Sequence, residues 1–257
     1  MSRKDALKQA AAKAISLLDL TNLNDVCTPA DIADLCARAT TPHGKVAAIC
    51  IWKEHVRQAR KLLKGTGIRI ATVVNFPAGG TDVDAVIAET EQAIADGADE
   101  IDLVLPYRAL IVGAEGVARY MVRRIARTCR GKALLKVIIE TGELKDVGLI
   151  RRASGLSIEE GADFIKTSTG KVPVNATPEA AEIMLKVIAR TGRKIGFKPA
   201  GGIRTTADAA AYLDLAARIM GRKWAGPRTL RFGASSVLAD LLATLDGKAP
   251  AKSSGGY

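Results

Sequence analysis

Short apolar or β-branched runs recur along the chain about once every 30 residues, with helix-like segments between them. Several of these runs are continuously hydrophobic, which is typical of parallel strands that are covered on both faces. A spacing of about 30 residues matches one strand–helix unit. The expected strands are Leu17–Thr21, Val46–Ile51, Ile68–Val74, Glu100–Leu105, Leu134–Glu140, Asp163–Lys166, Ile195–Lys198 and Thr229–Phe232.

The segments between the strands carry helix start and stop signals. Thr81 is the expected N-cap of one helix, which Gly97 ends. Thr177 followed by Pro178 marks the start of another helix. The expected buried faces of these two helices are Val83, Val86, Ile87, Thr90, Ala93 and Ile94 in the first, and Ala180, Ile183, Met184, Val187 and Ile188 in the second.

Eight strands alternating with helices predict a single α/β domain, a (β/α)8 TIM barrel, in this chain of 257 residues. An extra helix is expected before the first strand. The barrel domain is expected to span residues 1–246, and residues 247–257, rich in Ser, Gly, Ala and Lys, are expected to form a mobile C-terminal tail. A doubly wound open sheet is the structural alternative, because the stretch between Lys198 and Thr229 predicts a helix with no intervening strand.

The net charge of +11 raises the hypothesis of nucleic-acid binding. The charges are spread along helices, however, and aromatic residues make up only 4% of the chain, so stacking platforms for bases are scarce. A basic, soluble surface is the simpler interpretation. A local basic funnel for an anionic substrate would need only two or three of these charges.

The remaining composition indicates a reduced cytoplasmic protein. No run of about 18 apolar residues predicts a membrane span, and the N-terminus opens a charged amphipathic helix rather than a secretory signal. The four cysteines are far apart, and His43 and His55 are the only histidines, so a zinc site is not expected.

Lys166 and Lys198 each end a short apolar run and are each followed closely by glycine. Lysine is seldom fully buried, so two lysines at the mouths of buried strands need a reason. An amine with an ordinary pKa of about 10.4 needs a drop of about three pH units to be half neutral near pH 7. Burial and a nearby second cation both lower the pKa of a lysine. The pair therefore predicts an enzyme that forms an imine with a carbonyl substrate.

Functional groups of a (β/α)8 barrel gather at the carboxyl ends of the strands. The polar or reactive residues at or near those ends are Asp19, Cys50, Asn75, Asp102, Lys136, Lys166 and Lys198. Three alternatives remain open: Asp102 and the lysines could form an ion-pair network that only fills the barrel, Asp19 could cap a turn, and Cys50 could be a small buried apolar residue.

Glycine-rich segments follow the last three expected strands. They contain Gly170 and Lys171, then Gly201, Gly202 and Arg204, then Gly233, Ser235 and Ser236. Glycine lets backbone N–H groups approach an anion closely, and a helix N-terminus adds partial positive charge. Because barrels often bind phosphate at the loops after strands seven and eight, these segments predict a phosphate site.

At these residues the chain resembles the deoxyribose-phosphate aldolase family, from Leu17 to about Leu242. The motifs that carry the resemblance are Asn75-Phe-Pro, Gly97-Ala-Asp-Glu-Ile-Asp102, Lys136-Val-Ile-Ile-Glu-Thr-Gly-Glu-Leu, Phe164-Ile-Lys-Thr-Ser-Thr-Gly-Lys171, Gly196-Phe-Lys-Pro-Ala-Gly-Gly202 and Arg231-Phe-Gly-Ala-Ser-Ser236. The resemblance implies a (β/α)8 barrel with no metal or organic cofactor. It also implies reversible cleavage of 2-deoxy-D-ribose 5-phosphate to D-glyceraldehyde 3-phosphate and acetaldehyde, a step of deoxyribose phosphate catabolism.

The resemblance also assigns roles to single residues. It implies that Lys166 is the Schiff-base nucleophile, that Lys198 is the cation that keeps Lys166 partly neutral, and that Asp102 works in the proton relay. The terminal Tyr257 is implied to fold over the site and assist proton transfer. The implied substrate-binding residues are Asp19, Thr21 and Cys50 around the sugar, and Gly170, Lys171, Gly201, Gly202, Arg204, Gly233, Ser235 and Ser236 around the phosphate.

Asp102 poses a physical difficulty, because an aspartate beside two lysines favours their charged forms. The scheme therefore needs Asp102 to act mainly through the relay, or to interact more strongly with Lys198 than with Lys166.

The partners expected are small phosphorylated sugars and aldehydes rather than nucleic acid or a membrane, with a homodimer as a possible assembly. Rival functions are another lysine-dependent barrel aldolase, such as a transaldolase or a ketose-bisphosphate aldolase, and a nucleic-acid-binding protein. A metal-dependent aldolase is disfavoured by the two histidines.

Overall fold

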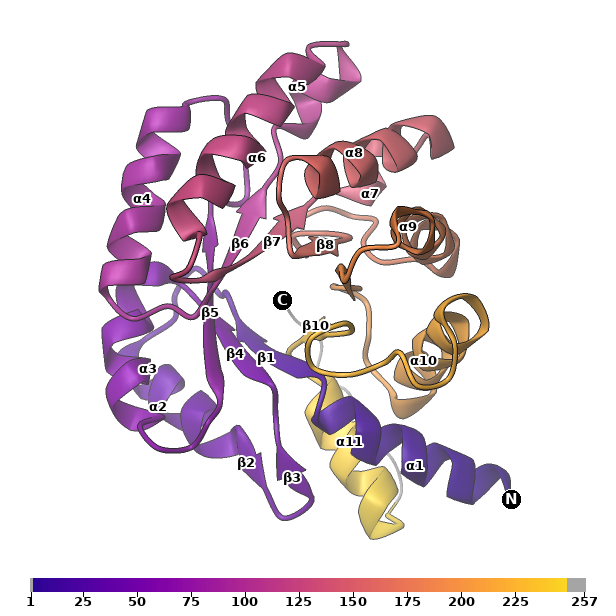
Figure 1. Ribbon diagram of the computed structural model, residues 1–257. Helices are drawn as coiled ribbons and strands as arrows, with labels where there is room; N and C mark the ends of the chain where they lie inside the picture. Colours follow the sequence, from indigo (N-terminus) through magenta and orange to yellow (C-terminus); the bar gives the residue numbers. More distant parts are fainter. Residues whose placement is uncertain (1, 249–257) are drawn as a thin grey trace.

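The structure is a computed structural model that describes residues 2–248. Its centre is a sheet of eight parallel strands with helices around the outside (Figure 1). The strands are β1 (Leu18–Asn22), β4 (Ala48–Ile51), β5 (Arg69–Val74), β6 (Glu100–Val104), β7 (Leu134–Ile138), β8 (Phe164–Lys166), β9 (Gly196–Lys198) and β10 (Phe232–Ala234). The predicted (β/α)8 barrel is confirmed.

The barrel closes because the last strand pairs with the first. The strand order is β10-β1-β4-β5-β6-β7-β8-β9, and Leu18 of β1 lies opposite Phe232 of β10. The bridges Phe197–Leu230 and Ala200–Gly233 join β9 to the β10 segment on the other side. An open doubly wound sheet would keep its first and last strands apart, so that alternative is wrong.

The last strand is the least accurate of the strand predictions. It was expected at Thr229–Phe232 and is found at Phe232–Ala234, because the register with β1 begins at Phe232. Two short strands, β2 (Thr40–Thr41) and β3 (Gly44–Lys45), form a small antiparallel hairpin that was not predicted. The other strands lie within the predicted ranges or overlap them closely.

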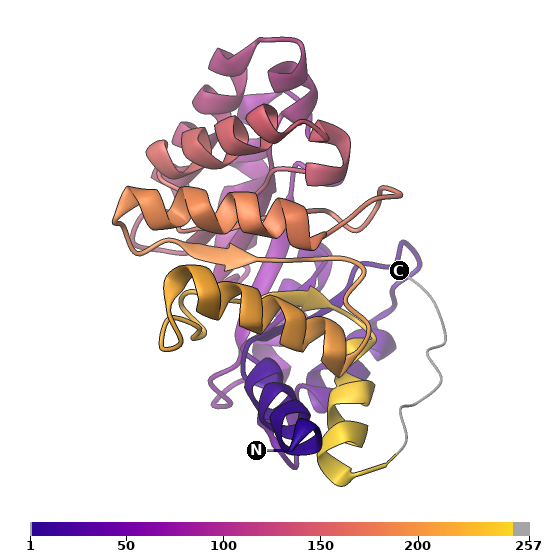
Figure 2. The same ribbon diagram turned by 90° about the vertical axis from the view of Figure 1, so that its right-hand side faces the viewer.

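The helices follow the strands around the barrel. Their bounds are α1 (Arg3–Ile15), α2 (Pro29–Arg38), α3 (Val56–Leu62) after the short 3-10 helix η1 (Lys53–His55), α4 (Val83–Ala95), α5 (Tyr107–Ile111), α6 (Glu115–Cys129), α7 (Thr141–Leu144), α8 (Val147–Glu159), α9 (Pro178–Thr191), α10 (Thr206–Met220) and α11 (Val237–Asp246). The expected extra helix is α1, which packs against α10 and α11 (Figure 2). No helix between residues 2 and 248 is long and apolar enough to cross a membrane.

Capping side chains mark the starts of α4 and α9, and one prediction needs correction. The N-cap of α4 is Asp82 rather than Thr81, because the Asp82 carboxylate accepts a hydrogen bond from the Ala85 N–H at 3.0 Å. Thr177 caps α9 as predicted, with Pro178 as the first helical residue. The predicted stop at Gly97 is also confirmed, since α4 ends at Ala95 and Gly97 has φ +106°.

The two faces of the strands differ in chemistry. The outer face packs with the helices into one large apolar core that includes Ile101, Val137 and Ile165. A separate small apolar cluster contains Cys50 of β4 and Val73 of β5. Glu100 and Asp102 occupy alternate positions on β6 with Ile101, so their side chains point to the opposite face, the barrel interior.

A glycine in β9 leaves room for an aromatic ring of the neighbouring strand. Gly196 lies opposite Phe164, and a Cβ on Gly196 would come within 2.2 Å of the Phe164 ring. We expect Gly196→Ala to lower the free energy of unfolding by about 1–3 kcal/mol, because the ring has to shift in a packed barrel wall. Chemical denaturation measures this loss.

The matched control is Gly116→Ala in α6, where a Cβ meets no other heavy atom within 4 Å. Alanine is the better helix former, so this change should leave stability equal or slightly higher. Equal stability of the two variants would contradict the packing role of Gly196.

Candidate active site

Lys166 and Lys198 are the last residues of two neighbouring strands, β8 and β9, and lie directly opposite each other in the register. Lys166 is 3% exposed and Lys198 is 0% exposed. The sequence prediction of two buried lysines at neighbouring strand ends is therefore confirmed. Their placement follows from parallel pairing, which brings the carboxyl ends of consecutive strands to one edge.

Both lysines bind the same oxygen atom of a buried aspartate. Asp102 accepts a hydrogen bond at Oδ2 from Lys166 Nζ and another from Lys198 Nζ, each at 2.8 Å. Its other oxygen, Oδ1, accepts from Lys136 Nζ at 2.7 Å. The amino groups of three lysines thus share one carboxylate. Because the two distances at Oδ2 are equal, Asp102 does not by itself distinguish Lys166 from Lys198.

A second aspartate makes that distinction. Lys198 Nζ lies 2.5 Å from Asp19 Oδ2, and Asp19 Oδ1 accepts a hydrogen bond from Arg231 at 2.5 Å. Lys166 pairs with Asp102 alone within the described part of the chain. The interpretation of Asp19 as a turn cap is wrong, because Asp19 lies inside β1 and its carboxylate binds the two buried cations.

The pKa values of the two lysines move in opposite directions. Burial lowers the pKa of Lys166, and neighbouring Lys198 lowers it further, against the raising effect of Asp102. Burial opposes the charged form of Lys198 too, but Asp102 and Asp19 together hold its pKa well above the ordinary value. Lys136 keeps its proton for the same reason, since Asp102 and Glu100 outweigh burial and raise its pKa. Lys166 is thus the amine of the three that gives up its proton most readily.

The two aspartates remain ionised. Burial would raise the pKa of Asp102, but Lys136, Lys166 and Lys198 bring it well below the ordinary value. The pKa of Asp19 is likewise lowered, because Lys198 and Arg231 outweigh burial. Both carboxylates can therefore accept hydrogen bonds from the buried cations around them.

Thr21 and Cys50 lie beside this network. Cys50 is fully buried in β4, and burial raises the pKa of its thiol, so it is a small wall residue rather than a thiolate nucleophile. The Thr21 hydroxyl donates to the Asp19 carbonyl at 2.8 Å. Thr21 and Ser235 line one cavity of about 140 Å³.

The three glycine-rich loops adjoin at the same end of the barrel as the lysines. The Ala200 N–H donates to the Thr167 hydroxyl at 3.0 Å, which links the loops after β8 and β9. The Gly201 N–H donates to the Gly233 carbonyl at 3.2 Å, which links the segments of β9 and β10. Gly170, Gly201 and Gly202 all have positive φ, of 89°, 81° and 81°, which glycine adopts without strain.

Gly233 has a further reason to lack a side chain. A Cβ at this position would lie 3.0 Å from Lys198 Cε and 2.8 Å from the Ala200 side chain. The glycine therefore makes room for the Lys198 side chain, in addition to any role toward phosphate. Ser235 and Ser236 follow it, and Ser236 occupies the N-cap position of α11.

The other predicted binding residues are less closely grouped. Lys171 Nζ pairs with Asp25 at 3.0 Å and lies 6.0 Å from the centre of the Trp52 ring. Arg204 is exposed, and its backbone N–H donates to the Asp208 carboxylate at 3.0 Å. Tyr257 and the expected tail from residue 249 onward lie outside the described residues.

Sequence reasoning did not single out Glu100 and Arg231. Lys136 Nζ lies 2.6 Å from Glu100, and the Arg231 guanidinium donates to Glu100 at 2.7 Å and to Asp19. Glu100 could have been found from its position two residues before Asp102, because alternate strand residues share a face. No such spacing relates Arg231 to Asp19 in β1 or to Glu100 in β6, because these residues are far from Arg231 in the sequence.

A third residue not singled out is Glu140, which follows β7 in a left-handed conformation with φ 55°. Its carboxylate accepts a hydrogen bond from the Thr169 N–H at 3.1 Å, next to Gly170. Burial raises the pKa of Glu140. This carboxyl group fixes the loop after β8, which carries the first of the predicted phosphate-binding residues.

Comparison with known proteins identifies the family of this chain. The family model described as DeoC/LacD family aldolase matches residues 13–243. A deoxyribose-phosphate aldolase of Agrobacterium fabrum (strain C58 / ATCC 33970) is 60% identical over 251 residues, which cover 97% of each chain.

Solved structures show the same fold. A candidate deoxyribose-phosphate aldolase from Coccidioides immitis superposes with a TM-score of 0.82 at 28% identity, over 91% of this chain and 86% of the other. One from Toxoplasma gondii ME49 has a TM-score of 0.87 at 24% identity, over 95% and 97% of the two chains, which supports the fold. With a family model matched from the end of α1 into α11 and a relative of 60% identity, the chain belongs to the DeoC/LacD family of aldolases.

Proposed function

We propose that Lys166 is the amine through which this aldolase reversibly cleaves 2-deoxy-D-ribose 5-phosphate to D-glyceraldehyde 3-phosphate and acetaldehyde. The observation that carries the proposal is the contrast between the lysines at one carboxylate. The pKa of Lys166 is lowered by burial, whereas Lys198 and Lys136 are held protonated. A neutral amine is the form that attacks an aldehyde.

The reaction follows from the electron demand of the bond that breaks. Lys166 condenses with the C1 aldehyde of the open-chain sugar, water leaves, and a protonated imine forms. The C3 hydroxyl loses its proton as the C2–C3 bond breaks. The electron pair of the C2–C3 bond forms the C1–C2 double bond, and the C1–N π electrons move onto the imine nitrogen to give a neutral enamine. Glyceraldehyde 3-phosphate departs. Protonation of the enamine carbon and hydrolysis of the imine release acetaldehyde and regenerate Lys166.

Asp102 and Lys198 supply the proton transfers in this scheme. Asp102 Oδ2 contacts both amines at 2.8 Å, so a proton can pass between Lys166 and Lys198 through this carboxylate. The Lys198 ammonium also disfavours a second positive charge on Lys166. No metal or organic cofactor is needed, because the protonated imine is itself the electron sink.

The phosphate of the substrate is proposed to bind the loops after β8, β9 and β10. The proximity of these loops and the positive φ of their glycines support this placement. The helix α11 begins just after Ser236 and directs its N-terminal partial positive charge to the same place. The proposed contacts are Gly170, Lys171, Gly201, Gly202, Gly233, Ser235 and Ser236, with Arg204 at the periphery.

Asp19, Thr21 and Cys50 are proposed to line the sugar pocket beside Lys198. Tyr257 is proposed to reach the site from the tail, 247–257, that follows the barrel domain of residues 1–246. A cytoplasmic location is supported by the free cysteines, of which Cys36, Cys50 and Cys129 are buried. A homodimer is supported by adjacent exposed apolar residues at the end of α5, Ile111 and Val112.

Reductive trapping tests the nucleophile and the substrate class together. Borohydride with acetaldehyde should add a two-carbon group to Lys166, because the reagent reduces the imine that acetaldehyde forms. Peptide mapping by mass spectrometry locates the adduct, and product analysis of 2-deoxyribose 5-phosphate should give glyceraldehyde 3-phosphate and acetaldehyde. An adduct on Lys198 or Lys136 would overturn the assignment, and a ketone product would favour a transaldolase or ketose-bisphosphate aldolase.

Removal of the neighbouring cation tests the role of Lys198. In Lys198→Leu the pKa of Lys166 should rise, since Lys166 becomes the amine that balances Asp102. Turnover at pH 7 should fall by about a hundredfold or more and recover in part as the pH is raised toward 9. The kcat/KM profile between pH 6 and 9.5 measures this.

The control for that experiment is Lys194→Leu, an exposed lysine on the same segment just before β9. It removes the same charge from the surface and should keep the wild-type rate. A wild-type rate for Lys198→Leu at neutral pH would remove Lys198 from the mechanism. Thermal melting of both variants separates loss of fold from loss of chemistry.

The tail is tested by a deletion and a point variant. Deleting residues 249–257 and, separately, Tyr257→Phe should each slow turnover by about a hundredfold, the usual size of a positioned proton-transfer group. The melting temperature should stay unchanged, because the barrel core lies outside this segment. Full activity after the deletion would exclude Tyr257 from the mechanism, and loss in the deletion alone would leave it a gating role without proton transfer.

A further inference from the structure

Six buried charged side chains form a closed ring in the barrel, in which acids and bases alternate. Around the ring stand Asp102, Lys136, Glu100, Arg231, Asp19 and Lys198. Each joins the next at a distance between 2.5 and 2.8 Å, and Lys198 closes the ring on Asp102. Lys166 is attached to this ring at Asp102 and is not one of its links.

The ring is balanced in charge without Lys166. It holds three carboxylates, Asp19, Glu100 and Asp102, and three cations, Lys136, Lys198 and Arg231. A proton on Lys166 therefore gives the buried cluster one positive charge in excess. Uncompensated buried charge is costly, and the group with the weakest pairing gives up its proton first. Lys166, which has one carboxylate shared with two other cations, is that group.

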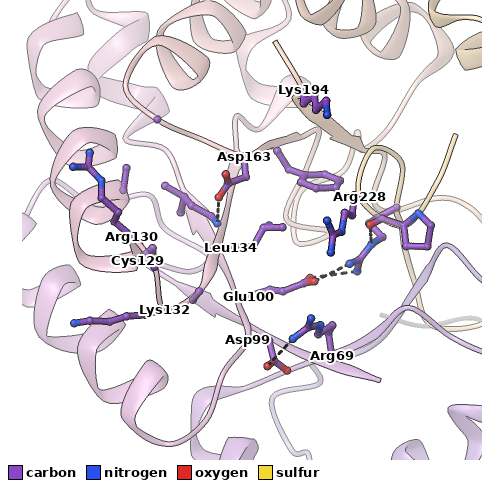
Figure 3. Close-up of a pocket in the computed structure, with 18 of the residues that line it drawn as sticks. Arg69, Asp99, Glu100, Cys129, Arg130, Lys132, Leu134, Asp163, Lys194 and Arg228 are labelled. Carbon is purple, nitrogen blue, oxygen red and sulfur yellow. Dashed lines mark hydrogen bonds and ion pairs between the residues drawn. The ribbon is translucent and has the colours of Figure 1, made fainter. Parts of the chain in front are cut away.

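Arg231 and Glu100 lie at the far end of the barrel from the proposed substrate. They line a cavity of about 730 Å³ that is also lined by Arg69 at the start of β5 and Leu134 at the start of β7 (Figure 3). Lys166 and Lys198, in contrast, end their strands. Neither Arg231 nor Glu100 contacts Lys166 directly, so an effect of either on the reactive amine has to pass through the charge of the ring.

We propose that Arg231 and Glu100 are positioning residues that set, from the opposite end of the barrel, how readily Lys166 becomes a neutral amine. The proposal rests on the proposed function of Lys166 and extends it. Arg231 supplies the third cation that keeps the ring neutral, and Glu100 supplies the carboxylate that keeps Lys136 and Arg231 paired. The whole ring, rather than Lys198 alone, then disfavours the protonated form of Lys166, because the ring is already neutral without it.

Other titratable groups near Lys166 do not replace this balance. Lys166 is faced by Asp102 and Lys198 and, at longer range, by Cys50 and Glu140. Burial raises the pKa of Cys50, which favours the neutral thiol. Glu140 is also shifted toward its neutral form by burial, and its oxygens bind the Thr169 N–H rather than a ring cation.

The charge of the ring predicts that Arg231→Met and Glu100→Gln shift the pH at which Lys166 becomes reactive in opposite directions. Arg231→Met leaves two cations against three carboxylates, so a proton on Lys166 restores neutrality and the pH at which the amine becomes reactive should rise by about one unit. Glu100→Gln leaves three cations against two carboxylates and should lower that pH by about as much. The double variant leaves two of each and should return close to the wild-type value.

The readout is the rate at which cyanoborohydride traps acetaldehyde on Lys166, followed from pH 6 to 10 with the full chain. Acetaldehyde does not titrate in this range, so a shift of the inflection relative to the wild-type protein reports the protonation of the Lys166 nitrogen. Arg228→Gln is the matched control, because Arg228 lines the same cavity, is exposed, and lies outside the ring. It should not move the inflection.

Three results would overturn the proposal. They are shifts of the same sign in Arg231→Met and Glu100→Gln, an inflection that neither variant moves, and a double variant displaced further than either single one. If Arg231→Met does not fold, the downward shift in Glu100→Gln, which preserves shape, decides alone. Failure of the wild-type protein to trap acetaldehyde on Lys166 would instead defeat the proposed function, so the two failures are distinguishable.

Discussion

One buried carboxylate, that of Asp102, organises the interior of this barrel, because it is shared by three lysines. A charge can be buried only with a partner, and removing one partner of a buried pair costs about 3–5 kcal/mol. Asp102 therefore keeps Lys136 and Lys198 in place and charged while leaving Lys166 the least paired. The same contact positions the reactive amine and provides a route for its proton.

Much of this arrangement could be predicted from the sequence, because it depends on local patterns. Apolar runs of strand length located the barrel strands, and Lys166 and Lys198 at the ends of two such runs located the reactive edge. Predictions failed where two local signals compete or where a distant strand decides the outcome. Thr81 and Asp82 can both cap a helix. The predicted position of the last strand differs from that of β10 because the extent of β10 depends on its partner β1, more than 200 residues away in the sequence.

The ring could not be predicted because its contacts join distant parts of the chain. Arg231 and Asp19 are separated by 212 positions and meet only because the barrel closes between β10 and β1. Gly233 is a second residue whose role depends on contacts that the sequence does not show. Its sequence context is typical of a phosphate loop, and only the packing reveals that a Cβ there would press on Lys198 Cε.

A hydrophobic pocket would also lower the pKa of a lysine, but it would leave no group to move the protons that an imine-forming reaction must transfer. A neutral ring of alternating charges avoids that conflict. It places Lys166 within hydrogen-bond distance of Asp102, which also binds the charged Lys198, and yet it offers Lys166 no carboxylate that is not shared with other cations. Lys166 is reactive, on this proposal, because the six charges of the ring already balance one another and a proton on Lys166 would add a seventh, uncompensated charge.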